Sequence, residues 1–259
     1  MNQVPTLSVI IAVQQAEANL PEIIQILRPE NHPDVEFLFC HTEADPRTPA
    51  LVGGPDNVVV LRGVDGSPIP HLWRDGINAA KAAKITITTA HCIPSASWIG
   101  RLKTTDMSQT VGIGGVIDNH CDSDAKGWAI FMLRYLPFAP PQTARHTGDI
   151  AADNAIYRRA EIMRHGDLLS EGFWEPSFHA RFSADGLVLR IDPALITYHR
   201  NRYSATSFAA HRFVHGRAFG LARIAHVVMH DMTADADQFP PFEVIEPGAF
   251  IRMIAIDKD

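Results

Sequence analysis

Short apolar runs alternate with helical segments in the amino-terminal part of the chain, and this alternation constrains the fold more than any other feature. Runs rich in β-branched residues predict buried strands at 8–13, 35–40, 58–61 and 85–89. Apolar residues at helical spacing predict helices at 16–27 and 72–83. This order predicts an α/β fold, with an open, mostly parallel, doubly wound sheet and helices on both faces. Ligands of such sheets bind beyond the carboxyl ends of the strands, so we expect a site near 12–15, 40–45 and 89–94.

The second half has a less regular pattern. A glycine-rich stretch at 111–116 is expected to form a strand or a bend. It is not expected to bind a dinucleotide, because it lacks the G-x-G-x-x-G spacing of such a site. Further helices are expected at 128–135, 155–165, 174–184 and 204–228. A strand expected at 187–191 should be stopped by Pro193.

Composition excludes several classes of protein. The 259 residues carry 23 Lys and Arg against 29 Asp and Glu, a net charge of −6, which argues against a dedicated nucleic-acid binder. No apolar run is long enough to span a membrane, and the first residues do not resemble a signal peptide. Three widely spaced cysteines indicate neither a disulfide framework nor a zinc knuckle. A cytoplasmic location is therefore expected.

A set of short motifs occurs in one order between about residues 7 and 225. The set comprises Ser8-Val9-Ile10-Ile11, Gly76-Ile77, Pro94, Trp98-Ile99, Asn154-Ala155-Ile156-Tyr157-Arg158-Arg159, Trp174-Glu175, Gly186, Pro193 and His199. In order and spacing it resembles the family 2 inverting glycosyltransferases, which have the GT-A fold and move a sugar from a nucleotide-sugar donor to an acceptor hydroxyl. The resemblance implies a single catalytic domain over 1–230, with a nucleotide-binding half at 1–117, an acceptor half at 118–230, and an acidic tail at 231–259.

An inverting transfer needs a carboxylate that takes the proton of the attacking hydroxyl. In the resembled family this base is the second acid of a Glu-Asp pair, about eleven residues before a glycine that precedes a strand. Counting back from Gly186 gives Glu175 as the candidate catalytic base. Glu171 is the local competitor, and a solvent-facing helical glutamate is the structural alternative. Trp174 stands at the position of the first acid and is expected either to line the acceptor pocket or to pack in the core.

The metal site departs from the family pattern. The family's Asp-x-Asp, which holds a divalent cation against the diphosphate, is replaced by Thr89-Ala90-His91. If Mn²⁺ or Mg²⁺ is the cofactor, His91 and His199 are the candidate ligands, since a neutral imidazole ligates Mn²⁺. The alternative is that both histidines are hydrogen-bonded structural residues. Without a metal, Arg200 and Arg202 are the expected counter-charges for the diphosphate.

The resemblance also implies residues on the donor and acceptor sides. Asn154, Trp174 and Arg202 are expected on the acceptor side of the sugar pocket. Asp45 is an alternative to Glu43 near the nucleotide, although it is equally suited to cap its own loop. The expected nucleotide-binding residues are Ala12, Val13, Gln14, Glu43, Arg74 and Ala90.

Charge is distributed unevenly near the carboxyl end. The stretch 193–230 has no Asp or Glu, and it contains Arg200, Arg202, Arg212, Arg217 and Arg223. This stretch predicts contact with an anionic ligand or surface, including peripheral contact with the inner face of a membrane. The alternative is a helix packed on the catalytic domain with its arginines in solvent.

Two other functions are compatible with the sequence. The loss of Asp-x-Asp favours a degenerate, non-catalytic domain that binds a nucleotide or a protein partner. A nucleotidyltransferase is a weaker alternative, because no Gly-rich, Lys-bearing phosphate loop follows the first strand. The donor sugar, its base and the acceptor (glycan, lipid or small molecule) are not specified by these motifs.

Overall fold

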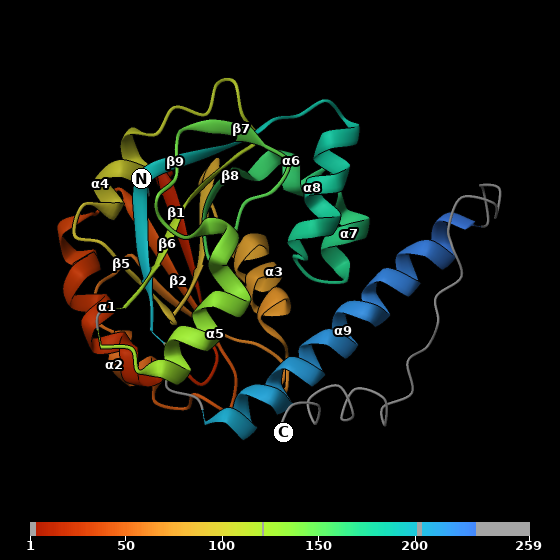
Figure 1. Ribbon diagram of the computed structural model, residues 1–259. Coiled ribbons are helices and arrows are strands. Elements are labelled where there is room, and N and C mark those ends of the chain that lie inside the picture. Colours follow the sequence, from red (N-terminus) through yellow and green to blue (C-terminus); the bar gives the residue numbers. More distant parts are fainter. Residues whose placement is uncertain (1–3, 121, 201–203, 232–259) are drawn as a thin grey trace. The chain divides into compact units, whose positions relative to one another are not determined.

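The computed structural model describes residues 4–120, 122–200 and 204–231 (Figure 1). The chain divides into two compact units, Met1–Phe219 and Gly220–Asp259. The division falls inside the last helix, and the domain bounds expected from the sequence stay predictions. Arg202 and all but the first residue of the expected acidic tail lie outside the described residues.

The elements follow the predicted alternation in the first half of the chain. The strands are β1 (Leu7–Val13), β2 (Val35–His41), β3 (Val58–Arg62), β4 (Lys84–Thr89), β5 (Cys92–Pro94), β6 (Gly112–Asn119), β7 (Arg145–Thr147), β8 (Asn154–Arg158) and β9 (Leu189–His199). The α-helices are α1 (Leu20–Leu27), α2 (Thr48–Val52), α3 (Ile69–Ala79), α4 (Trp98–Thr104), α5 (Ala125–Tyr135), α6 (Arg159–Met163), α7 (Gly166–Ser170), α8 (Glu175–Ala184) and α9 (Ala205–Asp231). Short 3₁₀ helices are η1 (Glu17–Asn19), η2 (Pro29–Asn31) and η3 (Leu136–Phe138).

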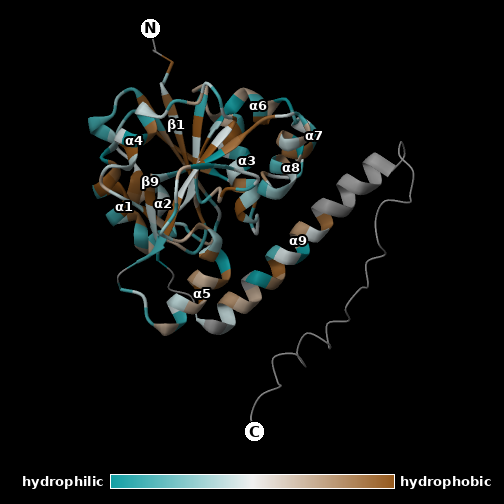
Figure 2. Cartoon of the chain, turned by 45° about the horizontal axis from the view of Figure 1, so that its top comes forward, coloured by the Kyte–Doolittle hydropathy of each residue, from teal (hydrophilic) through white to brown (hydrophobic). Residues whose placement is uncertain are grey.

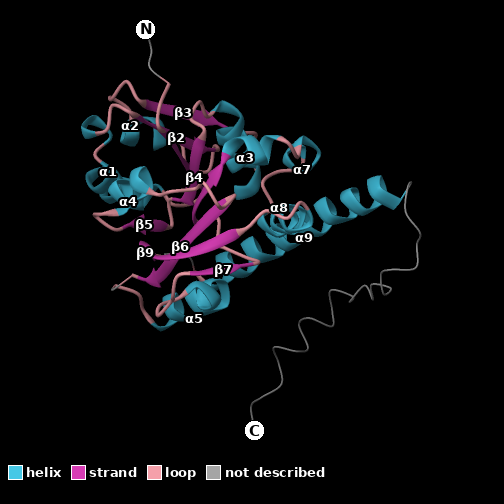
Figure 3. Cartoon of the chain, turned by 90° about the horizontal axis from the view of Figure 1, so that it is seen from above, coloured by secondary structure: helices cyan, strands magenta, loops and turns pink. Residues whose placement is uncertain are grey.

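All of these strands join one open sheet in the order β3-β2-β1-β4-β8-β6-β9-β5, and β7 pairs with β9 (Figure 3). Strands β3, β2, β1 and β4 are parallel to one another, as are β6 and β9. Strand β8 runs antiparallel between β4 and β6, and β5 and β7 run antiparallel to β9. The predicted α/β sheet is therefore confirmed, with antiparallel strands added in its second half.

Helices cover both faces of the sheet, and each face has its own core (Figure 1, Figure 2). Strand β1 shows the reason, because its alternate side chains point to opposite faces. Ile10 and Ala12 pack with α3, α7 and α8, whereas Val9, Ile11 and Val13 pack with α1 and α4. A strand that is apolar apart from Ser8 is stable only when both of its faces are covered.

Gly76 lets α3 approach β1 closely. A Cβ atom at this position would lie 2.3 Å from Cγ2 of Ile10 and 3.0 Å from Sγ of Cys40. The two groups belong to β1 and β2, so a larger residue would push the helix off the sheet. Gly76, part of the Gly76-Ile77 motif, thus has a packing role.

Two sequence-based predictions of secondary structure are wrong. The helix expected at 155–165 is strand β8 followed by α6. Ala155 and Tyr157 enter one core and Ile156 the other, and such a doubly buried strand has no polar face to distinguish it from a buried helix. The strand expected to stop before Pro193 continues to His199. The register shifts opposite this proline, between Gly114 and Val116, and so the missing N–H of Pro193 breaks no regular ladder.

Candidate functional site

A pocket of about 230 Å³ lies beside the carboxyl end of β4. Thr88, near that end of β4, pairs with Asn154 at the start of β8, and Asp153 immediately precedes β8. The lining residues come from α3, α5, η3, the segment before β8, α8 and α9: they are Ile69, Trp73, Leu133, Arg134, Tyr135, Phe138, Ala151, Asp153, Glu175, Arg212 and His215. Acidic and basic side chains therefore meet at the sheet edge where ligands of doubly wound folds bind.

Glu175 is the first residue of α8 and is partly buried in this pocket. Its carboxylate accepts a 3.0 Å hydrogen bond from the backbone N–H of Ala152. Burial raises the pKa of Glu175 to about 7, and the negative charges of Asp153 and Asp149 act in the same direction. Near neutral pH the carboxyl group is thus poised to accept a proton.

The alternative base, Glu171, is exposed and is not among the residues lining the pocket. Its backbone carbonyl accepts hydrogen bonds from the Trp174 indole, at 2.8 Å, and from the His71 ring, at 3.1 Å. Of these two glutamates, only Glu175 lines the pocket.

Asp153 and Arg134 are pocket residues that the sequence analysis missed. Nη2 of Arg134 lies 3.6 Å from Oδ1 of Asp153, and the Thr89 hydroxyl donates to the same Oδ1 at 3.0 Å. The Arg134 guanidinium also stacks over the Tyr135 ring, 4.7 Å from its centroid. Asp153 adjoins the Asn154 motif and was therefore within reach of sequence reasoning. No local pattern singled out Arg134.

His91 and His199 lie near each other, with ring centroids 6.5 Å apart, and both are buried. Nε2 of His91 lies 2.9 Å from the carbonyl oxygen of Gln14, so this nitrogen carries the proton and donates it. Burial lowers the pKa of His91 to about 4, and burial likewise holds the pKa of His199 well below its ordinary value. The positive charge of Arg134 adds to both shifts.

These two imidazoles do not fit the divalent cation site implied by the resemblance. Within the described ranges 4–120, 122–200 and 204–231, no three His, Cys, Asp or Glu side chains gather in a way that could hold a metal ion. His199 instead packs against the rings of Tyr135, at 4.8 Å, and Phe131, at 6.3 Å. Mn²⁺ and Mg²⁺ favour carboxylate oxygens, which this pair lacks. Within the described residues no further protein ligand of these kinds joins the two rings, and the His91–His199 metal site stays a prediction.

None of the expected nucleotide-binding residues lines the pocket around Glu175. The side chains of Ala12, Val13 and Ala90 are fully buried in the core, so they cannot be offered to a ligand. The Gln14 side chain donates to the carbonyl of Ser67 at 2.9 Å. Arg74 pairs with the neighbouring Asp75 at 2.9 Å.

The loop after β2 has a structural role at Asp45. The carboxylate of Asp45 accepts hydrogen bonds from the backbone N–H groups of Gln15, Ala16 and Glu17, at 2.7, 3.0 and 3.3 Å. Asp45 is buried, whereas Glu43 is exposed. The loop-capping alternative is confirmed for Asp45, and it fixes the backbone that follows β1.

Asn154 does not line the sugar pocket. Its side chain is fully buried, accepts a 2.8 Å hydrogen bond from the Trp98 indole, and donates to the carbonyls of Val116 and Leu195. These contacts join α4, β6 and β9 across the sheet. The predicted acceptor-side role of Asn154 is thus wrong, because all of its polar atoms are used inside the fold.

Trp174 is only 4% exposed, and its ring lies 5.3 Å from the rings of both His215 and Phe219. This matches the packing alternative of the sequence analysis. Arg200 is also committed to the fold, because it pairs with Glu22 at 2.5 Å and with Asp122 at 3.3 Å. It is therefore not the counter-charge for a diphosphate that the sequence analysis expected.

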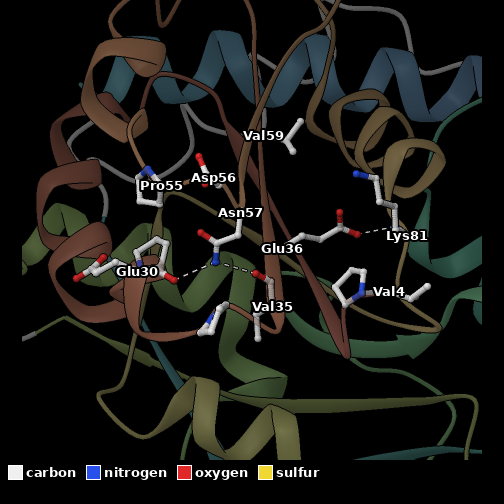
Figure 4. Close-up of a pocket in the computed structure, with 12 residues that line it drawn as sticks. Val4, Glu30, Val35, Glu36, Pro55, Asp56, Asn57, Val59 and Lys81 are labelled. Carbon is white, nitrogen blue, oxygen red and sulfur yellow. Dashed lines mark hydrogen bonds between the residues drawn. The ribbon is translucent and has the colours of Figure 1, made fainter. Parts of the chain in front are cut away.

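A larger pocket, of about 860 Å³, lies at the opposite, amino-terminal ends of β1 and β2 (Figure 4). Its Glu36 side chain accepts hydrogen bonds from the Ser8 hydroxyl and the Lys81 backbone N–H, both at 2.5 Å. The remaining lining is mostly proline and aliphatic, from Val4, Pro5, Pro29, Pro33, Val35, Pro55 and Val59. This pocket brings together fewer reactive groups than the one around Glu175, which we take as the candidate active site.

No helix within the part of the chain described here is both long and apolar enough to cross a lipid bilayer.

Comparison with solved structures supports the fold. No protein-family model and no curated protein sequence matches the chain. The structure is similar to a mannosyltransferase from Pyrobaculum calidifontis, solved in complex with GDP-Man and Mn²⁺, with a TM-score of 0.55, 11% identity, and coverage of 98% of this chain and 80% of that one. It is also similar to a mycobacterial protein, with a TM-score of 0.51, 15% identity, and coverage of 94% and 81%. The chain therefore has the α/β fold of the GT-A glycosyltransferases, a likeness that holds at the level of the fold.

Proposed function

We propose that the protein is a glycosyltransferase that moves a sugar from a nucleotide-sugar donor to an acceptor hydroxyl with inversion, and that Glu175 is its general base. The observation that carries the proposal is the Glu175 carboxyl group, which lies in a polar pocket at the ligand-binding edge of a GT-A fold with a pKa of about 7. A surface glutamate would be ionised far below neutral pH and would be a weaker base.

The proposed reaction needs one proton transfer and one substitution. Glu175 accepts the proton of the acceptor hydroxyl while the oxygen of that hydroxyl attacks the anomeric carbon of the donor sugar. The bond from that carbon to the diphosphate oxygen breaks on the opposite face, and its electron pair leaves with the nucleoside diphosphate. The Ala152 N–H holds one carboxylate oxygen, so it fixes the orientation of the base.

The direct test is incubation with a panel of nucleotide sugars and candidate acceptors, followed by measurement of released nucleoside diphosphate. Release that depends on acceptor and is lost in Glu175→Gln supports the proposal. Absence of release with every donor and acceptor, while thermal shifts report donor binding, contradicts it.

That second outcome would favour a non-catalytic nucleotide-binding domain. The observation on this side is the triplet Thr89-Ala90-His91, which has no carboxylate where the resembled family holds its cation. Glu175 distinguishes the two functions, because a binding domain has no need of a carboxyl group with a raised pKa.

We also propose peripheral contact with an anionic membrane surface. On α5, Trp128, Met132 and Leu133 are exposed, as are Phe213 and Val214 on α9. Leu133 and Arg212 line the pocket that contains Glu175, so apolar and cationic side chains lie beside the proposed base. Exposed apolar side chains together with arginines are typical of helices that bind at an anionic lipid surface.

A further inference from the structure

We infer that Arg134 supplies the positive charge that stabilises the departing nucleoside diphosphate, in place of a divalent cation. The inference rests on the proposed function, and it assigns the electrostatic part of the reaction. The carbon–oxygen bond breaks with its electron pair on the diphosphate, and the Arg134 guanidinium donates hydrogen bonds to those oxygens. Arg134 neither gives up nor accepts a proton, and it stays charged throughout.

The first support is the place of Arg134 in the pocket. It belongs to the last turn of α5 and lines the same cavity as Glu175, and its side chain is only 14% exposed. Stacking on the Tyr135 ring and pairing with Asp153 hold the guanidinium in position. A charge held in a shielded site acts on a leaving group without reorganising during the reaction.

The second support is the chemistry of guanidinium. Its planar array of N–H groups matches two phosphate oxygens at once, which a single point charge does not.

The third support is the environment at the end of β4, where the resembled family holds its metal. His91 stands there with a protonated nitrogen directed at the Gln14 carbonyl. Thr89, the last residue of β4, donates to Asp153, whose carboxylate lies 3.6 Å from the Arg134 guanidinium. A fixed positive charge so near opposes the binding of a second cation. The lack of carboxylate ligands in the His91–His199 pair and the positive charge of Arg134 both favour an arginine over a metal ion at this place.

Arg200 is less suited to this role, because carboxylates already bind it. Arg200 is bound by Glu22 and Asp122. Arg212 does line the pocket, and it is included in the experiment as a second contributor.

The experiment measures calorimetric binding of UDP, GDP, ADP, CDP, dTDP and inorganic pyrophosphate, in EDTA and in Mn²⁺. We expect at least one diphosphate to bind wild-type protein with the same affinity, within about twofold, in both buffers. Arg134→Met should weaken that binding by about tenfold or more, the size expected for a charge-assisted hydrogen bond, and Arg134→Lys should weaken it less. Arg212→Met is expected to have a smaller effect than Arg134→Met.

Arg164→Met is the matched control, because Arg164 is exposed, pairs with Glu161 and lies outside the pocket. Its diphosphate affinity should equal that of the wild type. Arg134→Met leaves the charge of Asp153 uncompensated, so the double variant Arg134→Met/Asp153→Asn is measured as well. The buffer comparison on the wild type needs no variant, so a requirement for Mn²⁺ overturns the inference even if Arg134→Met and the double variant fail to fold. In that case Arg134→Lys, which keeps the charge, tests the residue by its weakened binding.

The outcomes separate this inference from the proposed function. Diphosphate binding that requires Mn²⁺ overturns the inference and leaves sugar transfer standing. An undiminished affinity in Arg134→Met, or no diphosphate binding in either buffer, also overturns it. Metal-free binding that depends on Arg134, in a protein that transfers no sugar, overturns the proposed function and retains Arg134 as a diphosphate-binding residue.

Discussion

The carboxylate of Glu175 accepts a 3.0 Å hydrogen bond from the backbone N–H of Ala152, which ties the start of α8 to the segment before β8. This bond leaves the group oriented in the pocket that also holds Asp153. Glu175→Gln keeps the size of the side chain and an acceptor for Ala152, and removes the ability to take a proton. We expect turnover to fall by about 10²-fold or more, with nearly unchanged donor affinity. The measurement is steady-state release of nucleoside diphosphate, alongside calorimetric donor binding.

Glu171→Gln is the control for this change, because Glu171 is exposed and is not a lining residue of the pocket. Its turnover should match the wild type. Equal turnover in Glu175→Gln and wild type would remove Glu175 from the mechanism, and a loss confined to Glu171→Gln would assign the base there.

The pH dependence of the reaction should report the pKa of Glu175. The group is neutral below about pH 7 and ionised above it, so kcat/KM should rise as pH increases through about 7. An ordinary exposed glutamate would place this limb near its usual pKa, about 4.3. A pH–rate profile between pH 5 and 9 tests the assignment, and a flat profile over that range would contradict it.

Stability should change with pH in the opposite sense. Burial raises the pKa of Glu175 in the folded state, so its contribution to stability is fully present below the unfolded pKa and is lost as pH rises through about 7. Relative to wild type, Glu175→Gln should gain on the order of 2 kcal/mol between pH 4.5 and 8, a value reduced for partial exposure. Urea denaturation of both proteins at several pH values measures this difference. A constant difference across the range would show that the folded-state pKa is not raised.

Asn154→Ala should destabilise the fold instead of weakening substrate binding. The change leaves the Trp98 indole and the carbonyls of Val116 and Leu195 without their buried partner. We expect a loss of about 3 kcal/mol or more in the free energy of unfolding, measured by urea denaturation. Asn31→Ala, at an exposed position of η2, should cost less than about 0.5 kcal/mol. A stable Asn154→Ala variant with a raised KM would restore the acceptor-side role.

Membrane contact should depend on salt and on the exposed apolar side chains. The protein should sediment with anionic liposomes at low salt and be released at high salt, because exposed charges are screened within about 8–10 Å. Trp128→Ser/Phe213→Ser should lose most of this binding, whereas Val64→Ser, an exposed apolar residue after β3, should keep it. Protein that stays in the supernatant at both salts would contradict membrane contact.

The sequence predicted much of the sheet and one important site residue. Strands at 8–13, 35–40, 58–61 and 85–89 match β1 to β4 within one residue at each end, because short runs rich in β-branched and apolar residues are typical of strands. Glu175 was found from its spacing to Gly186, and the pocket contains it. In both cases the information is local, since it lies in residues that are close together in the sequence.

The assembly of the pocket could not be predicted from local sequence patterns. Arg134, Asp153 and Arg212 come from α5, the segment before β8, and α9, and no spacing links them in the sequence. Similarly, the polar atoms of Asn154 are used by groups from α4, β6 and β9. The sequence by itself determined the first four strands of the sheet and pointed to Glu175 as a candidate base, because apolar periodicity and motif spacing are properties of neighbouring residues. Only the tertiary structure decided which charges share the pocket and which polar groups are spent inside the core, because packing brings together residues that are distant in the chain.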